Sequence, residues 1–419
     1  MLLSLTLQVA ASLGAGTPPP SFVVVLMDDV GRDKVAAYGD HPQPAATPNM
    51  DRLAAKGVLF RNAWACASCS PTRATLLTGR FADRTGIGTV IRATDGVATP
   101  LARDEMTIPK ALPNHTSLTL GKWHLADGGD SATHANLLGF DAFLGWSMSN
   151  DYFNWTENNN GTLRPRSGYY PLELSSSALR VIEHAKDPYF LYYCPLLAHH
   201  PFHEPPAQLH PLSPGSGGNH VKHLQMVESM DTILGRLLDT IDLDTTYLFV
   251  IGDNGSPSGT VTPPFAPGHV KGTIYEGGVR VPFLVAGPGV APGAECEKLV
   301  QVTDLFATIV DLAGAPPVPR GAEDSISFAP LLANPAAQHG RHWMFAHRFP
   351  FPGSSHAFIE RRALRTDRWK MIDNGTGGDV ELYDLANDPF ETMNLMASQA
   401  TPAHRSIRDR LLGLMPKFP

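Results

Sequence analysis

The chain has 419 residues, of which 43% are hydrophobic and 17% are charged, a balance typical of a folded globular protein and not of a disordered one. Its formal net charge of −7 leaves no basic footprint, so nucleic acid is not an expected partner. A chain of this length accommodates one large domain and a smaller one.

The first 16 residues (MLLSLTLQVAASLGAG) are apolar or small, and no Lys or Arg occurs before Arg32. An apolar stretch followed by Ala and Gly is typical of a secretory signal, although the usual positive start is missing. We therefore expect residues 1–20 to be a signal peptide and the protein to be secreted or periplasmic. The alternatives are a frayed first strand or a misassigned start codon. No other run reaches the length of a membrane span, so we expect none.

Four short apolar runs each lead into polar residues of chemical interest. Runs rich in Val, Ile, Leu and Phe predict strands that are buried on both faces, as in parallel sheets. The four runs are Phe22–Met27, Thr116–Leu120, Tyr189–Cys194 and Tyr247–Ile251.

Helical patterns lie between these runs, at Asn49–Lys56, Val221–Ile241 and Thr303–Leu312. Strands that alternate with helices predict an α/β fold, here a large, mixed and mostly parallel doubly wound sheet flanked by helices. Ligands of such sheets bind beyond the carboxyl ends of the strands, which is where the polar residues fall.

The pattern changes near the C-terminus. Three prolines within residues 316–319 mark a linker, and short strand-like pieces follow, such as Trp369–Ile372 and Val380–Leu385. We therefore expect a main domain over residues 21–320 and a small C-terminal subdomain, with an antiparallel sheet, over residues 321–419.

Two pairs of polar residues directly follow predicted strands, Asp28-Asp29 and Asp253-Asn254. Three carboxylates and a carboxamide offer only oxygen ligands, which suits a hard cation such as Ca²⁺ or Mg²⁺ and not zinc. Taken singly, such a pair is more often a helix cap or a turn former. Two pairs at strand ends of one sheet favour a metal site.

The segment Cys69–Arg80 reads CSPTRATLLTGR. A Cys followed by Pro after two residues and Arg after four is unusual for a structural turn. The alternative is a helix start with Pro71 in its first turn and Cys69 buried. Cys66 completes a C-x-x-C pair, but no second pair follows at zinc-finger spacing, and Cys194 is typical of a buried small hydrophobe.

The segment resembles the C-x-P-[ST]-R signature of the type I sulfatases, a family within the alkaline phosphatase superfamily. A single DNG would mean little, but further blocks follow in that family's order and cover nearly the whole chain after the leader. These blocks are TPNMDRLAAKGVLFRNAW (47–64), GKWHL (121–125), DNG (253–255), YEGGVRVP (275–282) and LYDLANDPFETMNL (382–395).

The resemblance implies that a separate maturation enzyme oxidises Cys69 to Cα-formylglycine, whose hydrate is the nucleophile. It also implies one Ca²⁺ with a specific ligand set: Asp28, Asp29, Cys69, Asp253 and Asn254. Arg73 is expected to hydrogen-bond the hydrate and to hold the carboxylates. Lys122 and Lys271 are expected to neutralise charge on the sulfate oxygens, and His124 to be the base that releases sulfate.

The acid that protonates the leaving group is less sharply defined by the resemblance. The chain reads HHPFHEP from His199, which matches the family's H-x-P-x-H-x-P spacing. We therefore expect His199 to be the acid, with His200 and His203 as alternatives.

The resemblance implies hydrolysis of a sulfate monoester carried by a small molecule or a glycan. An aromatic-rich stretch, Trp146–Tyr170, is either a substrate-binding loop or surface packing. One rival function is a phosphonate monoester or phosphodiester hydrolase, because related enzymes share the sheet, the metal residues and the modified Cys. Another is a non-catalytic binding protein on the same fold, against which the intact set of charged residues argues.

Overall fold

The computed structural model describes residues 19–92, 99–126, 131–147, 151–186, 188–213, 215–318, 320–353, 360–375, 379–397 and 400–418. All but the last two residues of the expected signal peptide, residues 1–20, lie outside this part of the chain. No helix within these ranges combines the length and the apolar character needed to cross a membrane.

A ten-stranded mixed sheet forms the centre of the protein, with the strand order β10-β2-β9-β8-β1-β7-β3-β4-β5-β6. Its four central strands pair in parallel. They are the four runs predicted from the sequence, each within one residue of its expected ends: β8 (Thr246–Gly252), β1 (Ser21–Met27), β7 (Tyr189–Cys194) and β3 (Thr116–Gly121).

The outer strands make the sheet mixed. β9 pairs antiparallel with β8 and β2, and β5 pairs antiparallel with β4 and β6, whereas β2–β10 and β3–β4 are parallel. These six strands are β2 (Val58–Trp64), β9 (Phe283–Ala286), β10 (Ala294–Gln301), β4 (Ala142–Ser147), β5 (Asn154–Asn159) and β6 (Thr162–Ser167).

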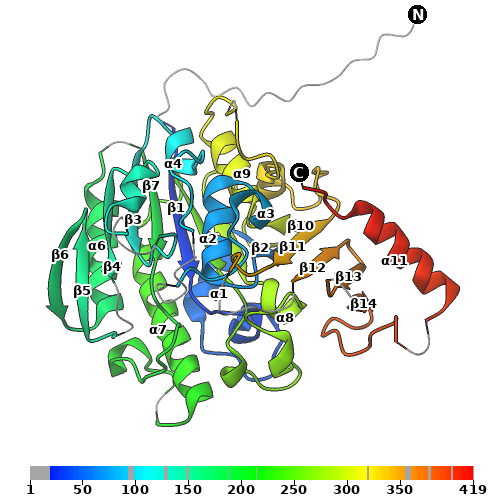
Figure 1. Ribbon diagram of the computed structural model, residues 1–419. Helices are drawn as coiled ribbons and strands as arrows, with labels where there is room; N and C mark the ends of the chain where they lie inside the picture. Colours follow the sequence, from blue (N-terminus) through cyan, green and yellow to red (C-terminus); the bar gives the residue numbers. More distant parts are fainter. Residues whose placement is uncertain are drawn as a thin grey trace, which may run out of the picture.

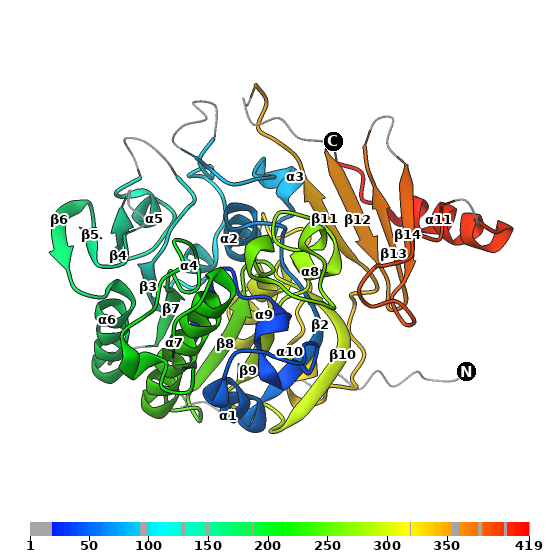
Figure 2. The same ribbon diagram turned by 90° about the horizontal axis from the view of Figure 1, so that it is seen from below.

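Helices cover both faces of the sheet (Figures 1 and 2). Strand β1 shows why its run is continuously apolar: Phe22, Val24 and Leu26 pack into the core on one face, and Val23 and Val25 into the core on the other. Since successive side chains of a strand point to opposite faces, a strand covered on both sides has no polar position.

One face carries α1 (Pro48–Lys56), α6 (Tyr170–His184) and α7 (Asn219–Thr240). The other carries α2 (Cys69–Thr78), α4 (Ile108–Ala111), α9 (Asp304–Leu312) and α10 (Ala329–Ala333). Three single-turn helices lie in the connections: α3 (Ala82–Thr85), α5 (His134–Leu137) and α8 (Glu276–Val279). The helices predicted at 49–56, 221–241 and 303–312 are α1, α7 and α9.

The C-terminal part forms an antiparallel four-stranded sheet beside the β10 edge of the main sheet (Figure 1). It comprises β11 (Met344–Arg348), β12 (Arg361–Arg365), β13 (Trp369–Asp373) and β14 (Val380–Asp384), followed by helix α11 (Pro402–Leu414). The boundary expected at residues 320 and 321 stays a prediction, and helix α10, which lies after it, packs into the main core.

A buried cluster of charges joins the two parts. Glu276, at the start of α8, forms ion pairs with Arg365 of β12 and, at 3.2 Å, with Lys370 of β13. Lys370 also pairs with Glu391 at 2.8 Å, and Glu391 accepts a hydrogen bond from the backbone N–H of Glu276. The small sheet is therefore connected to the segment that begins at Lys271.

Candidate active site

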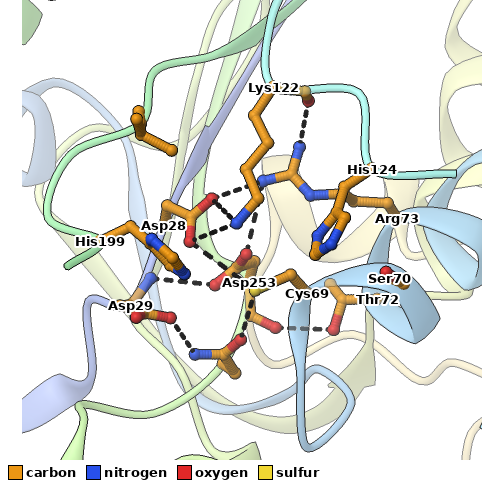
Figure 3. A network of polar contacts seen from close by, with 12 residues as sticks. Asp28, Asp29, Cys69, Ser70, Thr72, Arg73, Lys122, His124, His199 and Asp253 are labelled. Carbon is orange, nitrogen blue, oxygen red and sulfur yellow. Dashed lines mark hydrogen bonds and ion pairs between the residues drawn. The ribbon is translucent and has the colours of Figure 1, made fainter. Parts of the chain in front are cut away.

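The predicted site residues gather at the carboxyl ends of the four central parallel strands (Figure 3). Asp28 follows β1, Lys122 follows β3, Asp253 follows β8, and His199 lies in the loop after β7. Because β8, β1, β7 and β3 are adjacent and parallel, these side chains, which lie far apart in the sequence, meet at one edge of the sheet.

The two neighbouring carboxylates of Asp28 and Asp29 lie in the same site. A regular strand would send them to opposite faces of the sheet. Asp29 instead adopts φ 62°, in the left-handed region, which Asp tolerates better than most residues. The chain therefore turns directly after Asp28, and the side chains of both residues point toward Cys69 (Figure 3).

Cys69 is the first residue of helix α2 and is 1% exposed. The hydroxyls of Thr72 and Ser70, both in the segment after Cys69, hold the first turn of α2 in place. Thr72 Oγ1 donates to the carbonyl of Asp253 at 2.6 Å and accepts from the N–H of Cys66 at 3.0 Å. Ser70 Oγ accepts from the N–H of Ile91 at 3.1 Å. The helix N-terminus, which favours negative charge, is thereby fixed at the site.

Four of the five predicted metal ligands form a tight group. Asp28, Asp29, Cys69 and Asp253 each offer one ligand atom, and these atoms lie within 4.8 Å of one another. The fifth, Asn254, has its carbonyl oxygen 3.4 Å from Cys69 Sγ. Carboxylate and amide oxygens are the donors that Ca²⁺ prefers, so the residues present fit this ion.

Three cations surround the carboxylates. Arg73, fully buried, donates to Asp28 at 2.9 Å, to Asp253 at 3.4 Å and to the carbonyl of Lys122 at 2.5 Å. Lys122 Nζ lies 3.0 and 2.8 Å from the two oxygens of Asp28. Lys271 Nζ pairs with Asp29 in the same way, at 2.6 and 2.5 Å.

Charges in the site balance, since three carboxylates face three cations. Burial by itself would raise the pKa of Asp28, but Lys122 and the other positive groups around it lower that pKa overall. Asp253 differs: burial raises its pKa to about 7, and the negative charge of Asp28 adds to the shift. A divalent cation would offset the mutual repulsion of these carboxylates and leave the site with a positive charge for an anionic substrate.

The thiol of Cys69 is a poor nucleophile in this environment. Burial raises its pKa, and the carboxylate of Asp253 raises it further. Since only the thiolate attacks, an unmodified Cys69 stays inert at neutral pH. All four cysteines are buried and none of them forms a disulfide.

His124 lies beside Cys69 (Figure 3). Its Nε2 is 3.1 Å from the carbonyl of Ile91. A carbonyl can only accept, so Nε2 carries the proton and Nδ1 keeps a lone pair. Burial lowers the pKa of His124, and Lys122 lowers it further, so the ring is neutral and able to accept a proton.

His199 also reaches the site, next to Asp28 and Asp29 (Figure 3). Its Nδ1 donates to the carbonyl of His200 at 2.8 Å, so Nε2 is the atom free to exchange a proton. Burial lowers the pKa of His199 to about 3, and Lys122 contributes. The negative charge of a bound sulfate ester would raise that pKa toward the range of an acid.

The two alternative histidines lie further out. His200 is exposed, and its ring packs on His199 with centroids 4.2 Å apart. His203 is hydrogen-bonded through Nε2 to the hydroxyl of Tyr169 at 3.1 Å and packs on Tyr152. His203 is therefore part of an aromatic cluster, whereas His199 faces the carboxylates.

Most aromatic rings of the Trp146–Tyr170 stretch are buried. Tyr152 is 2% exposed, and its hydroxyl lies 2.6 Å from the carbonyl of His199, so it supports the His199 loop. Trp155, Tyr169 and Tyr170 are buried as well. Phe153 is the exception, 43% exposed, and stays a candidate for substrate contact.

The structure thus brings together the residues that the sequence predicts for the site. Lys271 lies neither at a strand end nor on α2. It comes from the loop between β8 and α8. Sequence reasoning missed the supporting roles of Ser70 and Tyr152. The position of Ser70 inside the Cys69 motif could have indicated its role. Nothing in the local sequence indicates that the Tyr152 hydroxyl donates to the carbonyl of His199.

Comparison with known families agrees with this geometry. Residues 20–315 match the family described as sulfatase, and residues 269–416 match the C-terminal region of N-sulphoglucosamine sulphohydrolase. The chain is 30% identical to arylsulfatase A of Bos taurus, over 95% of this chain and 87% of that protein. It is 31% identical to N-acetylgalactosamine-6-sulfatase of Sus scrofa, over 77% of this chain and 68% of that protein.

The fold also matches solved structures. The crystal structure of Ps i-CgsB in complex with k-i-k-neocarrahexaose superimposes with a TM-score of 0.81 and 24% identity, covering 94% of this chain and 92% of that one. The structure of BT4656 in complex with D-glucosamine-2-N,6-O-disulfate gives a TM-score of 0.77 at 20% identity, covering 95% and 97%. At these identities the likeness concerns the fold.

Proposed function

This chain belongs to the sulfatase family and is a sulfuric ester hydrolase, and we propose that it cleaves a sulfate monoester with a nucleophile made from Cys69. The single observation that carries the proposal is the placement of Cys69. Its Sγ lies 3.7 Å from Asp28 and 3.4 Å from Asn254, at the centre of the carboxylate and cation cluster, yet the thiol itself is protonated there.

Oxidation of residue 69 to formylglycine by a separate maturation enzyme removes that obstacle. The aldehyde adds water and gives a geminal diol with two hydroxyls on one carbon. Bound Ca²⁺ would lower the pKa of the attacking hydroxyl and attract the anionic substrate, with Asp28, Asp29, Asp253 and Asn254 as the protein ligands. The buried Arg73 holds Asp28 and Asp253 in place and would hydrogen-bond the diol.

Substrate binding falls to the lysines. Lys122 and Lys271 each present an ammonium at the carboxylate cluster, and the positive charge of each lowers the pKa of the Cys69 thiol. They are the groups best placed to neutralise the sulfate oxygens as charge builds on them, usually the largest contribution in such catalysis.

In the first half of the reaction, one hydroxyl of residue 69 loses its proton to solvent, and its oxygen attacks sulfur as the bond between sulfur and the substrate oxygen breaks. His199 gives a proton from Nε2 to the departing alcohol. Residue 69 is left carrying the sulfate.

In the second half, the remaining hydroxyl gives its proton to Nδ1 of His124. The carbonyl re-forms as the bond between carbon and the sulfate oxygen breaks, and inorganic sulfate leaves. Water then hydrates the aldehyde for the next turnover. A serine at position 69 would lack the second hydroxyl and so this route of release.

The substrate is proposed to be a sulfated small molecule or glycan. Support comes from the relatives, which include an N-acetylgalactosamine-6-sulfatase. The expected signal peptide supports export to the periplasm or the outside of the cell. The phosphonate or phosphodiester reaction remains the second candidate, separated from the first by comparing a sulfate ester with its phosphate analogue.

The test is to measure, on the same preparations, the fraction of formylglycine at position 69 by peptide mass spectrometry and the rate on an aryl sulfate. Activity should track this fraction, rise when a maturation enzyme is co-expressed and vanish in Cys69→Ala. Cys66→Ala is the matched control, because that buried thiol touches Thr75 at 3.6 Å and not the carboxylates. Full turnover by protein whose Cys69 is wholly unmodified would falsify the mechanism.

A further inference from the structure

The main-chain carbonyl of Asp29 is bonded by a histidine of helix α7. His223 Nε2 lies 3.0 Å from this oxygen, and the His223 side chain is completely buried. Because a carbonyl only accepts hydrogen bonds, the proton sits on Nε2 and the ring donates. His223 thus connects the helical layer on one face of the sheet to the turn that carries two of the predicted metal ligands.

This contact acts at the point where the backbone leaves the strand. Asp29 has φ 62°, and the direction of the Asp29 side chain depends on how the peptide after it is oriented. The other polar groups of Asp29 are held within the site: its N–H donates to Asp253 at 3.0 Å, and its carboxylate accepts from Asn254 at 2.9 Å. Within the described residues, the carbonyl of Asp29 accepts its hydrogen bond from His223.

The same ring contacts the loop of the expected acid. Phe202, three residues after His199, packs edge-on against His223 with centroids 5.5 Å apart and an interplanar angle of 83°. One buried side chain therefore touches both the Asp29 turn and the His199 loop.

We propose that His223 is a positioning residue that sets the affinity of the calcium site by holding the backbone of Asp29 in its left-handed turn. The inference rests on the metal site of the proposed function. Outer partners that orient metal ligands typically change metal affinity by about 10- to 100-fold when they are removed. His223→Phe keeps the ring and the packing on Phe202 but removes the donor.

The experiment is calorimetric titration of Ca²⁺ into the chelator-treated full chain. His223→Phe should bind Ca²⁺ about 10- to 100-fold more weakly than the wild type. His223→Gln, whose amide can still donate, should stay within about threefold of the wild type, as expected when the hydrogen bond is kept.

His115→Phe is the matched control. His115 is also buried, at 8% exposure, its Nε2 bonds the carbonyl of Pro20 at 3.0 Å, and its ring packs on Phe22. It precedes β3, at the end of the sheet opposite to the site. His115→Phe should therefore bind Ca²⁺ as the wild type does.

Equal affinity of the wild type and His223→Phe would overturn the inference, as would an equal loss in His115→Phe. If the wild type itself does not bind Ca²⁺, the proposed metal site fails instead. Should His223→Phe not fold, His223→Asn replaces it, because its amide is too short to reach Asp29. Weaker Ca²⁺ binding by His223→Asn, together with wild-type binding by His223→Gln, supports the role of His223. Equal Ca²⁺ affinities of the two variants refute it.

Discussion

Arg73 is the side chain on which the stability and the chemistry of the site both depend, and Arg73→Lys separates the two. Arg73 is fully buried, and its guanidinium spans two acceptors at short range, Asp28 at 2.9 Å and the carbonyl of Lys122 at 2.5 Å, with Asp253 at 3.4 Å. Lysine keeps the positive charge but ends in a single ammonium.

The magnitude follows from these contacts. An ammonium at this position can reach Asp28 or the Lys122 carbonyl, but not both. The variant then loses one charge-assisted hydrogen bond, at about 1.5–3 kcal/mol, and leaves a buried acceptor unsatisfied, at about 1–3 kcal/mol. We expect the free energy of unfolding to fall by about 3 kcal/mol. Because a single ammonium no longer holds Asp28 and Asp253 together, kcat should fall about 100-fold or more.

The assay combines urea unfolding with steady-state rates on an aryl sulfate, using protein matched for formylglycine content. Arg341→Lys is the control: Arg341 is 6% exposed and bonds both carboxylate oxygens of Asp304 and the carbonyl of Asp324, outside the site. The unfolding free energy of Arg341→Lys should fall by a comparable amount, while the folded protein should keep a kcat near that of the wild type. If both variants retain the same kcat, Arg73 has no role beyond folding and the reasoning is refuted.

Three further predictions concern the metal, the two histidines and the buried charge cluster. Chelation or Asp253→Ala should each lower activity about 100-fold or more, and unchanged turnover in both would exclude the metal. Across a series of leaving groups, His199→Ala should slow poor leaving groups most, whereas His124→Ala should slow sulfate release regardless of the leaving group; equal losses for His199→Ala would point to another acid. Burial raises the pKa of Glu391 from 4.5 to about 7, although Lys370 opposes the shift. Its ionisation therefore costs stability as pH rises through that window. Glu391→Gln removes the ionisable group, so the fall in unfolding free energy between pH 5 and pH 8 should be smaller in the variant than in the wild type, by up to about 3 kcal/mol; equal changes in the two proteins, measured by urea unfolding at both pH values, would contradict this.

Several features could be read from local sequence alone. The runs before Asp28 and Asp253 are continuously apolar because both faces of β1 and β8 are covered, so their strand character needs no tertiary information. The motif around Cys69 and its family resemblance predicted the nucleophile, and the oxygen-only side chains predicted the kind of metal. The family is confirmed, and the structure gathers the expected oxygen-bearing side chains in one cluster, whereas the modified nucleophile and the calcium ion stay predictions.

Other elements carried too little local signal. Every residue of β6 is exposed, so its strand has no buried face and no hydrophobic pattern to read. The aromatic stretch shows the opposite ambiguity: Tyr152 is buried under the His199 loop and Phe153 is exposed, although the two are neighbours of similar hydrophobicity. Composition cannot decide which of two adjacent rings faces the core.

The sequence by itself indicated which chemical groups belong to the predicted site and which strand ends carry Asp28, Lys122 and Asp253, because residue type and apolar periodicity are local properties. Only the tertiary structure decided how the groups meet. Asp29 and Asn254, 225 positions apart, are hydrogen-bonded because β8 and β1 lie side by side, and the turn of Asp29 brings its carboxylate to the same side as that of Asp28. Likewise, the helical pattern places His223 on a helix but not against a carbonyl of the β1 turn. Contacts of this kind depend on the order of strands and the packing of layers, which the whole chain determines together through the burial of its two cores.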